Sequence, residues 1–205
     1  MREFVYYSGK ARTTGNFDVH DLMKAGRMDI ACHVVVGTFF LSHKIREDAK
    51  LHLVFYGMPD PPKHIEMQPS KALPRGRNEE EGARIDISKK DVAGLIKRIL
   101  FKYKPGKKTE AFPGFSIEKK SLLKVVDELM NEGKTIYILD KDGEDIRTVG
   151  IKNDCVFVLG DHEGLPIKEL KRLKRECVPV SIGNRTYFAS QVVAIVNNEL
   201  DRRGI

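Results

Sequence analysis

Two uninterrupted apolar segments constrain the fold of this chain more than any other feature. They are Thr135–Leu139 (TIYIL) and Cys155–Leu159 (CVFVL). A strand with one solvated face alternates apolar and polar residues, whereas continuous apolar runs are typical of strands covered on both faces of a parallel sheet. Because amphipathic helical segments alternate with such runs, the sequence predicts an α/β fold with a mostly parallel sheet and helices on both faces.

The same periodicities divide the rest of the chain into strands and helices. Further strands are expected at 2–7, 51–56 and 178–182, and helices at 29–43, 88–103, 118–132, 166–175 and from 190 onward. Gly37 inside the first helix either weakens that prediction or marks close packing. The predicted N-caps are Asp29, Ser88 and Ser190, and Gly133 is expected just after a helix end.

Three stretches show neither pattern. Gly, Asn and Pro residues punctuate 13–27 and 104–115, which are expected to be loops. A longer irregular segment covers about 57–87. Because so long a loop in a compact domain is usually functional or hides short strands, 84–87 is predicted to be one such strand. The 205 residues are expected to form a single domain.

Membrane, secretory and disulfide-stabilised classes are disfavoured by the sequence. No apolar run approaches the roughly 20 residues that cross a bilayer. The first residues, MREFVYYSGK, lack the pattern of a secretory signal, so a cytoplasmic protein is expected. The three cysteines are too widely spaced for a disulfide framework or a metal knuckle, so no metal site is predicted.

Basic residues are concentrated in two stretches of a chain whose formal net charge is +7. The second stretch, 168–175, has five basic residues and one acid. The first has aromatic residues interleaved and no acid, and its basic residues are Lys97, Arg98, Lys102, Lys104, Lys107 and Lys108. Phosphate binding and an ordinary solvated face remain about equally good interpretations of this pattern.

Several common catalytic motifs are absent. No GxGxxG follows a strand, and no GxxxxGK[ST], HExxH or GxSxG occurs in the sequence. A dinucleotide oxidoreductase, a P-loop nucleotidase, a zinc protease and a serine hydrolase are therefore disfavoured.

Glycines follow two of the predicted C-terminal strands. Gly160 begins the loop GDHEGLP after Leu159, and Gly183 follows the strand that ends at Ile182. A third loop follows Leu139. In an open α/β sheet, ligands bind outside the carboxyl ends of the strands, where such loops lie. Three loops of this kind could hold an adenine ring through main-chain groups, or they could be simple turns.

The C-terminal motifs carry a more specific resemblance. VFVLGDHEGLP, VPVSIG and SQVVAIVNNELDRR together resemble the C-terminal half of the SPOUT methyltransferases. TTGNFDVHDLMKAGRMDI and LSHKIREDAKLHLVFYG further resemble the archaeal tRNA pseudouridine-54 N1-methyltransferase family, so the likeness covers nearly the whole chain. It implies a deep trefoil knot at about 135–205, S-adenosylmethionine (SAM) as methyl donor, a homodimer, and tRNA as substrate.

The resemblance also implies functional residues. The cofactor site would comprise Leu139, Leu159, Gly160, Ile182, Gly183, Tyr187 and Phe188. Asp18 or Asp21 could accept the N1 proton of pseudouridine, and Arg27 could hold the developing negative charge. The basic residues of 97–108 would contact tRNA phosphates. The chain departs from the family's DLPGAGRMD pattern at Met23 and Lys24, so the shape of this loop is not carried over.

Other functions remain compatible with the sequence. One is a SPOUT enzyme that methylates a pseudouridine in ribosomal RNA. Another is a dimeric RNA-binding protein that has kept the fold and lost the chemistry. A Rossmann-like enzyme acting on a small molecule fits less well, because the glycine fingerprint is missing.

Overall fold

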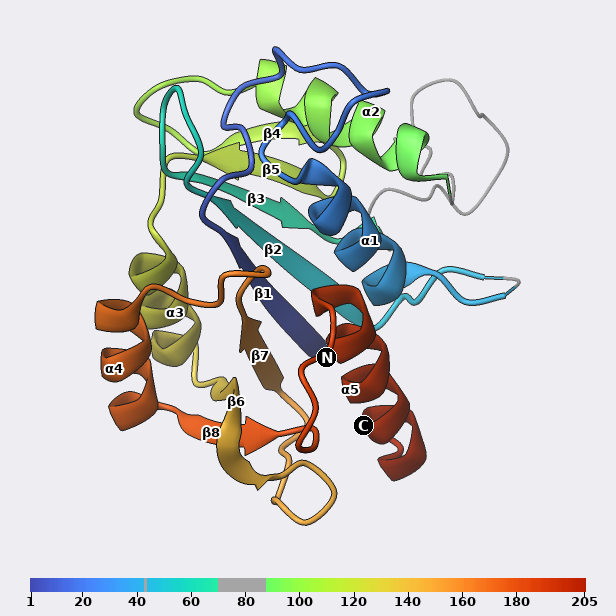
Figure 1. Ribbon diagram of the computed structural model, residues 1–205, viewed down its shortest axis with the longest axis vertical. Helices are drawn as coiled ribbons and strands as arrows, with labels where there is room; N and C mark the ends of the chain where they lie inside the picture. Colours follow the sequence, from blue (N-terminus) through green and yellow to red (C-terminus); the bar gives the residue numbers. More distant parts are fainter. Residues whose placement is uncertain (43, 70–87) are drawn as a thin grey trace.

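One eight-stranded sheet organises the computed structural model, which describes residues 1–42, 44–69 and 88–205. The strand order is β4-β5-β3-β2-β1-β7-β6-β8 (Figure 1). The strands are β1 (Arg2–Ser8), β2 (Ala49–Phe55), β3 (Lys63–Met67), β4 (Thr109–Phe112), β5 (Phe115–Glu118), β6 (Thr135–Asp145), β7 (Cys155–Leu159) and β8 (Val178–Ser181). The helices are α1 (Met28–Phe39), α2 (Lys89–Phe101), α3 (Leu122–Asn131), α4 (Ile167–Glu176) and α5 (Ala189–Arg203).

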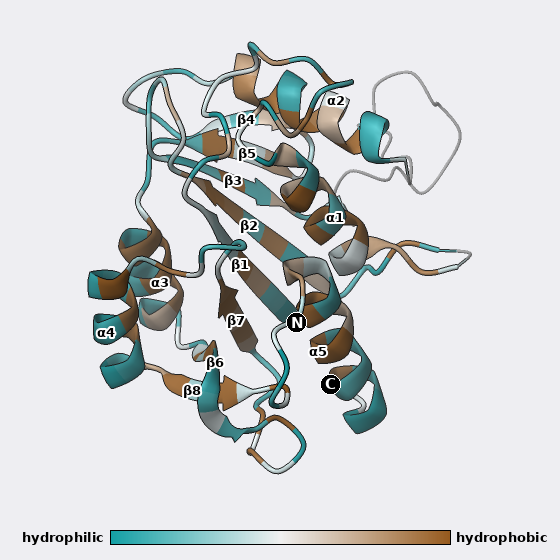
Figure 2. Ribbon diagram, in the orientation of Figure 1, coloured by the Kyte–Doolittle hydropathy of each residue, from teal (hydrophilic) through white to brown (hydrophobic). Residues whose placement is uncertain are grey.

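Helices cover both faces of the sheet, as predicted. Along β1, Phe4 and Tyr6 face the core that includes residues of α1, α2 and α5, whereas Val5 and Tyr7 face the core that includes α3. The alternation repeats along β7, all of whose residues are buried and which is uniformly hydrophobic in Figure 2. The apolar run of β7 therefore fills two layers at once, which is why it has no polar positions.

Parallel pairing places the carboxyl ends of four strands, β2, β1, β7 and β6, on the same side of the sheet. β1 pairs in parallel with both β2 and β7, and β7 pairs in parallel with β6. In the β1–β7 register, Tyr6 lies opposite Leu159, so the residues that follow the two strands are neighbours. β3, β4 and β5 extend the sheet with antiparallel pairings.

The antiparallel part bears on three predictions. The irregular segment from about 57, expected to be functional or to hide short strands, contains β3. The loop expected at 104–115 instead contains β4 and the start of β5, joined at Pro113 and Gly114, whose φ is 76°. These strands are short and partly polar, so they have little periodic signal. Glu118 belongs to β5, so the helix predicted from 118 begins only at Leu122, after the cap Ser121. The strand predicted at 84–87 lies outside the described residues.

Two predicted N-caps were also wrong. Asp29 lies in the first turn of α1, which follows Arg27, and Ser190 lies inside α5, whose start is fixed by the Phe188 N–H donating to Gln191 Oε1 at 3.0 Å. The side chain of Ser88 does cap α2, and Gly133 follows α3 with φ 82°.

Gly37 marks close packing between two helices. A Cβ at this position would lie 3.1 Å from the Ser190 carbonyl oxygen, so glycine allows α1 to approach α5. Asn197 of α5 donates to the Gly37 carbonyl at 3.0 Å, which fixes the contact. None of the described helices is both long and apolar enough to span a bilayer.

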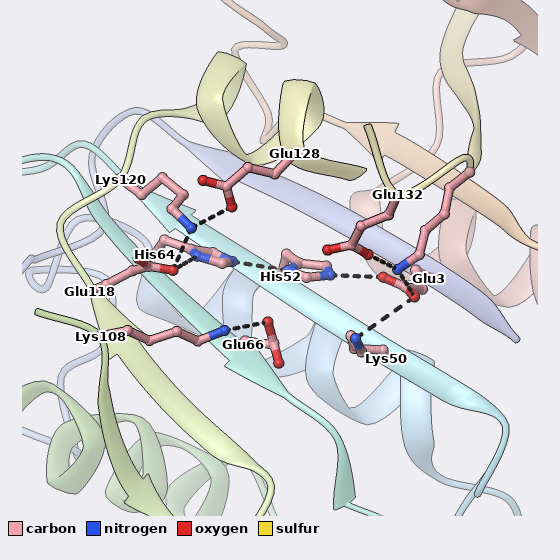
Figure 3. Close-up of polar contacts among 11 residues, drawn as sticks. Glu3, Lys50, His52, His64, Glu66, Lys108, Glu118, Lys120, Glu128 and Glu132 are labelled. Carbon is pink, nitrogen blue, oxygen red and sulfur yellow. Dashed lines mark hydrogen bonds and ion pairs between the residues drawn. The ribbon is translucent and has the colours of Figure 1, made fainter. Parts of the chain in front are cut away.

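Four residues, three of them buried and Glu118 partly buried, form a hydrogen-bonded row across β1, β2, β3 and β5 (Figure 3). Glu3 Oε2 lies 3.0 Å from His52 Nε2, His52 Nδ1 lies 2.9 Å from His64 Nε2, and His64 Nδ1 lies 3.2 Å from Glu118 Oε1. Lys134 donates to Glu3 at 2.6 Å. With both carboxylates ionised, three hydrogen bonds need three ring protons, so the two histidines together carry one positive charge.

The row keeps its charges balanced at neutral pH. Burial and the nearby positive charge of His52 lower the pKa of His64 to about 4, against the pull of Glu118. Burial alone would raise the pKa of Glu3, but its hydrogen bonds to His52 and Lys134 bring it to about 2. Burial would also raise the pKa of Glu118, but hydrogen bonds from His64 and Lys120 outweigh this effect and bring the pKa to about 2.

These shifts predict that acid destabilises the fold. His64 binds its second ring proton in the unfolded chain near pH 6.5 and in the folded chain near pH 4, so stability falls as pH drops between these values. The two glutamates add a further loss from about pH 4.5 downward. Urea unfolding at pH 7, 5.5 and 4.5 should show a loss of at least about 1 kcal/mol, since one pKa unit is worth about 1.4 kcal/mol. His64→Gln should flatten the change above pH 5, and a stability independent of pH over this range would contradict the account.

Candidate active site

A hollow lies beside the middle of β6 and the end of β8. The loop predicted after Leu139 is not present, because β6 continues to Asp145. Its volume is about 170 Å³. The residues that line it are Leu139, Asp140, Lys141, Val180, Ser181, Ile182, Gly183, Arg185, Thr186, Tyr187 and Val192. Leu139, Ile182, Gly183 and Tyr187, four of the predicted cofactor-binding residues, are therefore brought together. Because pockets for whole drug-sized ligands usually measure roughly 300–1,000 Å³, this hollow suits one end of a ligand of that size.

Gly183 shapes the wall of the hollow. Its φ is +126°, a conformation that side-chain-bearing residues rarely adopt. Its N–H donates to Ser181 Oγ at 3.1 Å, so the chain turns back on itself directly after β8. Lys141 and Arg185 place positive charge beside apolar Leu139, Ile182 and Val192, and the wall thus offers both apolar surface and cations.

The other three predicted cofactor residues do not line this hollow. Leu159 is buried in the core, and Phe188 is 69 % exposed at the start of α5. Gly160 begins a loop that closes tightly, with the Gly164 N–H donating to the Asp161 carbonyl at 3.0 Å. A Cβ at Gly160 would lie 2.4 Å from the Gly164 carbonyl carbon, so only glycine fits there.

Asp161 is a structural residue that the sequence analysis did not select. Its buried carboxylate accepts hydrogen bonds from Gly9 N at 2.9 Å, Ser8 Oγ at 3.2 Å and Glu163 N at 2.9 Å. It therefore joins the loop after β7 to the loop after β1. The only signal in the sequence was an acidic residue directly after a glycine that ends a strand.

Two of the predicted catalytic residues lie on the surface of the loop between β1 and α1. Asp18 is exposed and its Oδ1 accepts a hydrogen bond from His20 N at 2.9 Å. Asp21 forms an ion pair with Lys24 at 2.8 Å, and the hydrogen bond from Lys24 lowers the pKa of Asp21. A lowered pKa makes a carboxylate a weaker base. Neither aspartate lines the hollow at β6 and β8.

Arg27, the third predicted catalytic residue, has an unusual backbone. Its φ of 62° makes it the only non-glycine residue with a positive φ in the described part of the chain. Such strain persists only where surrounding contacts impose it, and it is often found at functional sites. Its guanidinium donates to both carboxylate oxygens of Asp29, at 3.0 and 3.1 Å. The hydrogen bonds from Arg27 keep the pKa of Asp29 low even though burial would raise it.

A buried phenol lies beneath this loop. The Tyr6 side chain is fully buried on β1. Burial raises its pKa, and the charge of Asp161 raises it further, as does that of Asp29. Arg27, Asp29, Asp161 and Tyr6 thus come from three separate segments to one place at the carboxyl end of β1.

The predicted RNA-binding residues on and after α2 have different roles. Lys97 donates to the Phe17 carbonyl at 2.8 Å and so supports the loop after β1. Lys102 donates to the Ala111 carbonyl at 2.9 Å, and Lys108 pairs with Glu66 at 3.0 Å. Arg98 stacks over the Phe112 ring. Lys104 and Lys107 are exposed.

A second basic surface lies on α4. Lys168, Lys171 and Arg175 are exposed and follow helical spacing, so they lie on one face of the helix. Within the described part of the chain none of the three has an ion pair, whereas Arg172 pairs with Asp127 and Lys174 with Asp140. Because Asp140 lines the hollow, α4 lies next to it. Among the described residues, no group of three or more His, Cys, Asp or Glu side chains could hold a metal ion.

Sequence comparisons identify relatives that match over the full length. The model of a family described as "Putative SAM-dependent RNA methyltransferase" matches residues 1–205. A protein of Methanococcoides burtonii is 35 % identical over 98 % of this chain and 96 % of its own length, and one of Pyrococcus abyssi is 34 % identical over the whole of both chains. Both are named tRNA (pseudouridine(54)-N(1))-methyltransferase.

A solved structure is similar in fold. Archaeoglobus fulgidus Nep1, crystallised with S-adenosylhomocysteine, superposes with a TM-score of 0.61 over 100 % of this chain and 99 % of its own. The sequence identity is 15 %, so the likeness concerns the fold alone.

Replacing Gly160 by alanine should destabilise the protein. The added Cβ would collide with main-chain atoms of Gly164, which forces the loop to open, at a cost of about 1–3 kcal/mol. Gly94→Ala is a matched control, because a Cβ there meets no atom within 4 Å and alanine favours the helix by about 1 kcal/mol. Urea unfolding of both variants measures the difference, and equal stabilities would contradict the predicted collision.

Proposed function

We propose that this chain, which belongs to the family of SAM-dependent tRNA (pseudouridine(54)-N(1))-methyltransferases, methylates N1 of pseudouridine 54 in the T-loop of tRNA. The single observation that carries the proposal is full-length identity of about a third to relatives of that name. A hollow lined by four of the seven predicted cofactor residues supports it. A dimeric RNA-binding protein without chemistry would not need this hollow.

The residues around the hollow fit part of the cofactor. Leu139, Ile182 and Tyr187 would cover the faces of the adenosine moiety, and the turn at Gly183 leaves no side chain in the way. Asp140 is held by Lys174 at 2.7 Å and is thereby fixed at the rim. When bound, the cofactor supplies a methyl group on a positively charged sulfur atom, which an electron-rich nitrogen can attack without a metal. Leu159, Gly160 and Phe188 would complete the site from the neighbouring loop and from the start of α5.

The chain's own task is to bind the base and manage its N1 proton. Asp18 or Asp21 would accept the proton, and Asp18 has the advantage that it forms no ion pair with another described residue. Arg27 would stabilise the negative charge that remains on the base, because Asp29 holds its guanidinium in a fixed orientation. Holding both reactants in line supplies much of the rate.

Arg27→Gln should lower kcat for methyl transfer by about 10²-fold, the usual cost of losing one group that stabilises developing charge. The affinity for S-adenosylhomocysteine should change little, since Arg27 does not line the hollow. Arg147→Gln is the control, because Arg147 is an exposed arginine outside this loop and does not line the hollow. Single-turnover rates of the three proteins decide, and an Arg27→Gln enzyme as fast as the wild type would exclude the role.

Two basic surfaces would contact the tRNA. One lies at the end of α2 and comprises the predicted residues Lys97, Arg98, Lys102, Lys104, Lys107 and Lys108, of which Lys104 and Lys107 are the freest for phosphates. The other is the exposed face of α4. Flipping the target base out of its stack costs a few kcal/mol, which phosphate contacts help to offset.

Neutralising these surfaces should weaken tRNA binding and its salt dependence together. Lys104→Ala with Lys107→Ala, and separately Lys168→Ala with Lys171→Ala, should each lower the slope of log K against log salt by about 0.7–0.9 per lost phosphate contact. Lys89→Ala with Lys90→Ala removes the same charge from the opposite end of α2. Binding titrations at several salt concentrations test this. If the control pair has the same effect, general attraction and not a defined surface is responsible.

The finer architecture belongs to the same proposal. A trefoil knot in about 135–205 is proposed from the resemblance of the C-terminal motifs to the SPOUT methyltransferases, and the likeness of the fold to Nep1 supports it. A homodimer is supported by the exposed Tyr187 and Phe188 beside the hollow, which a second copy would cover. The single domain would act in the cytoplasm, where its tRNA substrate is found. Light scattering of the purified protein measures the mass, and a monomer at micromolar concentration would contradict the dimer.

The activity is tested by mass spectrometry of RNA nucleosides after incubation with SAM. Archaeal tRNA with pseudouridine at position 54 should gain one methyl group at that nucleoside, and the same tRNA with uridine should gain none. Methylation of ribosomal RNA alone would indicate the related SPOUT activity. If no RNA is methylated although it binds, the protein is an RNA-binding protein and the proposal fails.

A further inference from the structure

One buried carboxylate joins the two loops at the carboxyl ends of β1 and β7. The side chain of Asp161 is only 1 % exposed. Its Oδ2 accepts hydrogen bonds from Gly9 N and Ser8 Oγ, and its Oδ1 accepts one from Glu163 N. All three donors are therefore held by a single group, although Ser8 and Asp161 are 153 residues apart in sequence.

The segment held by Asp161 has no room to move on its other sides. A Cβ at Gly57 would lie 2.2 Å from the Lys10 carbonyl oxygen, and a Cβ at Gly26 would lie 1.7 Å from it. The Ala11 N–H donates to Ser8 Oγ at 3.2 Å, so the position of Ser8 also restrains Ala11. On the protein surface, the side chain of Lys10 forms an ion pair with Glu163. A shift of the loop after β7 must therefore move residues 9–11, and those residues contact Gly26, next to Arg27.

We propose that Asp161 is a positioning residue that couples cofactor binding to RNA binding. This inference rests on the proposed function, in which the loop at 160–164 belongs to the cofactor site and the loop at 9–27 to the RNA site. A ligand that fixes one loop then fixes the other through Asp161. By thermodynamic linkage, each ligand strengthens the binding of the other by the same factor.

The chemistry of the position calls for a carboxylate. An ionised aspartate is an acceptor at both oxygens, and hydrogen bonds from N–H groups to a charged acceptor are about twice as strong as neutral ones. An asparagine has the same shape but only one acceptor oxygen. Its NH2 group would face either Gly9 N or Glu163 N, donor against donor, and one of the two loops would be released.

The experiment measures the affinity of S-adenosylhomocysteine by calorimetry, alone and with saturating pseudouridine-containing tRNA. In the wild type, tRNA should tighten the binding about fivefold or more, the usual lower range for coupled sites. In Asp161→Asn the ratio of the affinity for S-adenosylhomocysteine with tRNA to the affinity without it should fall towards one, even though each ligand still binds. Ser8→Ala, which leaves the bond from Gly9, should give an intermediate ratio. Asp154→Asn is the control, because it makes the same substitution at an exposed ion pair with the N-terminal amine, at the opposite end of β7 from the two loops.

Other outcomes would overturn the inference. A folded Asp161→Asn protein with the wild-type ratio would show that the carboxylate has no coupling role, as would lower affinities for both ligands at an unchanged ratio. Should Asp161→Asn fail to fold, a wild-type ratio in Ser8→Ala has the same meaning. If the wild type binds both ligands but tRNA does not change its affinity for S-adenosylhomocysteine, the coupling is refuted and the proposed function is not. A wild type that does not bind S-adenosylhomocysteine refutes the proposed function itself.

Discussion

The parallel pairing of β1 with β7 is the constraint on which the rest of the structure depends. It joins the first residues of the chain to its last third and buries an apolar strand between two layers of helices. Because the register sets Tyr6 opposite Leu159, Ser8 and Asp161 follow as neighbours. Two loops that carry different candidate functions thereby share one buried carboxylate. Contacts between such distant segments slow folding, but they let one sheet edge collect residues from the whole chain.

The other half of the sheet is organised by charge. Next to α3, the row from Glu3 through His52 and His64 to Glu118 takes the place of apolar packing. Buried ionic rows add little net stability, but they disfavour any register in which a partner is missing. The row thus fixes how β3 and β5 join β2. It thereby also fixes the hairpin of β4 and β5, which packs against the basic end of α2.

The sequence predicted best what depends on local pattern. Continuous apolar runs identified β6 and β7, and glycines at strand ends, together with the family resemblance, led to Leu139, Ile182, Gly183 and Tyr187, which share one hollow. The short hairpin of β4 and β5 was missed because its polar, partly exposed strands have no clear period. The role of Asp161 and the left-handed backbone of Arg27 could not be predicted, because both are imposed by residues far away in sequence.

A crystal structure with S-adenosylhomocysteine tests the central claim most directly. The account predicts that the adenosine lies between Leu139, Ile182 and Tyr187, and that the sulfur points towards the loop at Gly160. A larger hollow of about 710 Å³ lies elsewhere, beside Arg2, Arg46 and Asp201. Density for the ligand in that hollow, or in neither, would contradict the assignment of the cofactor site.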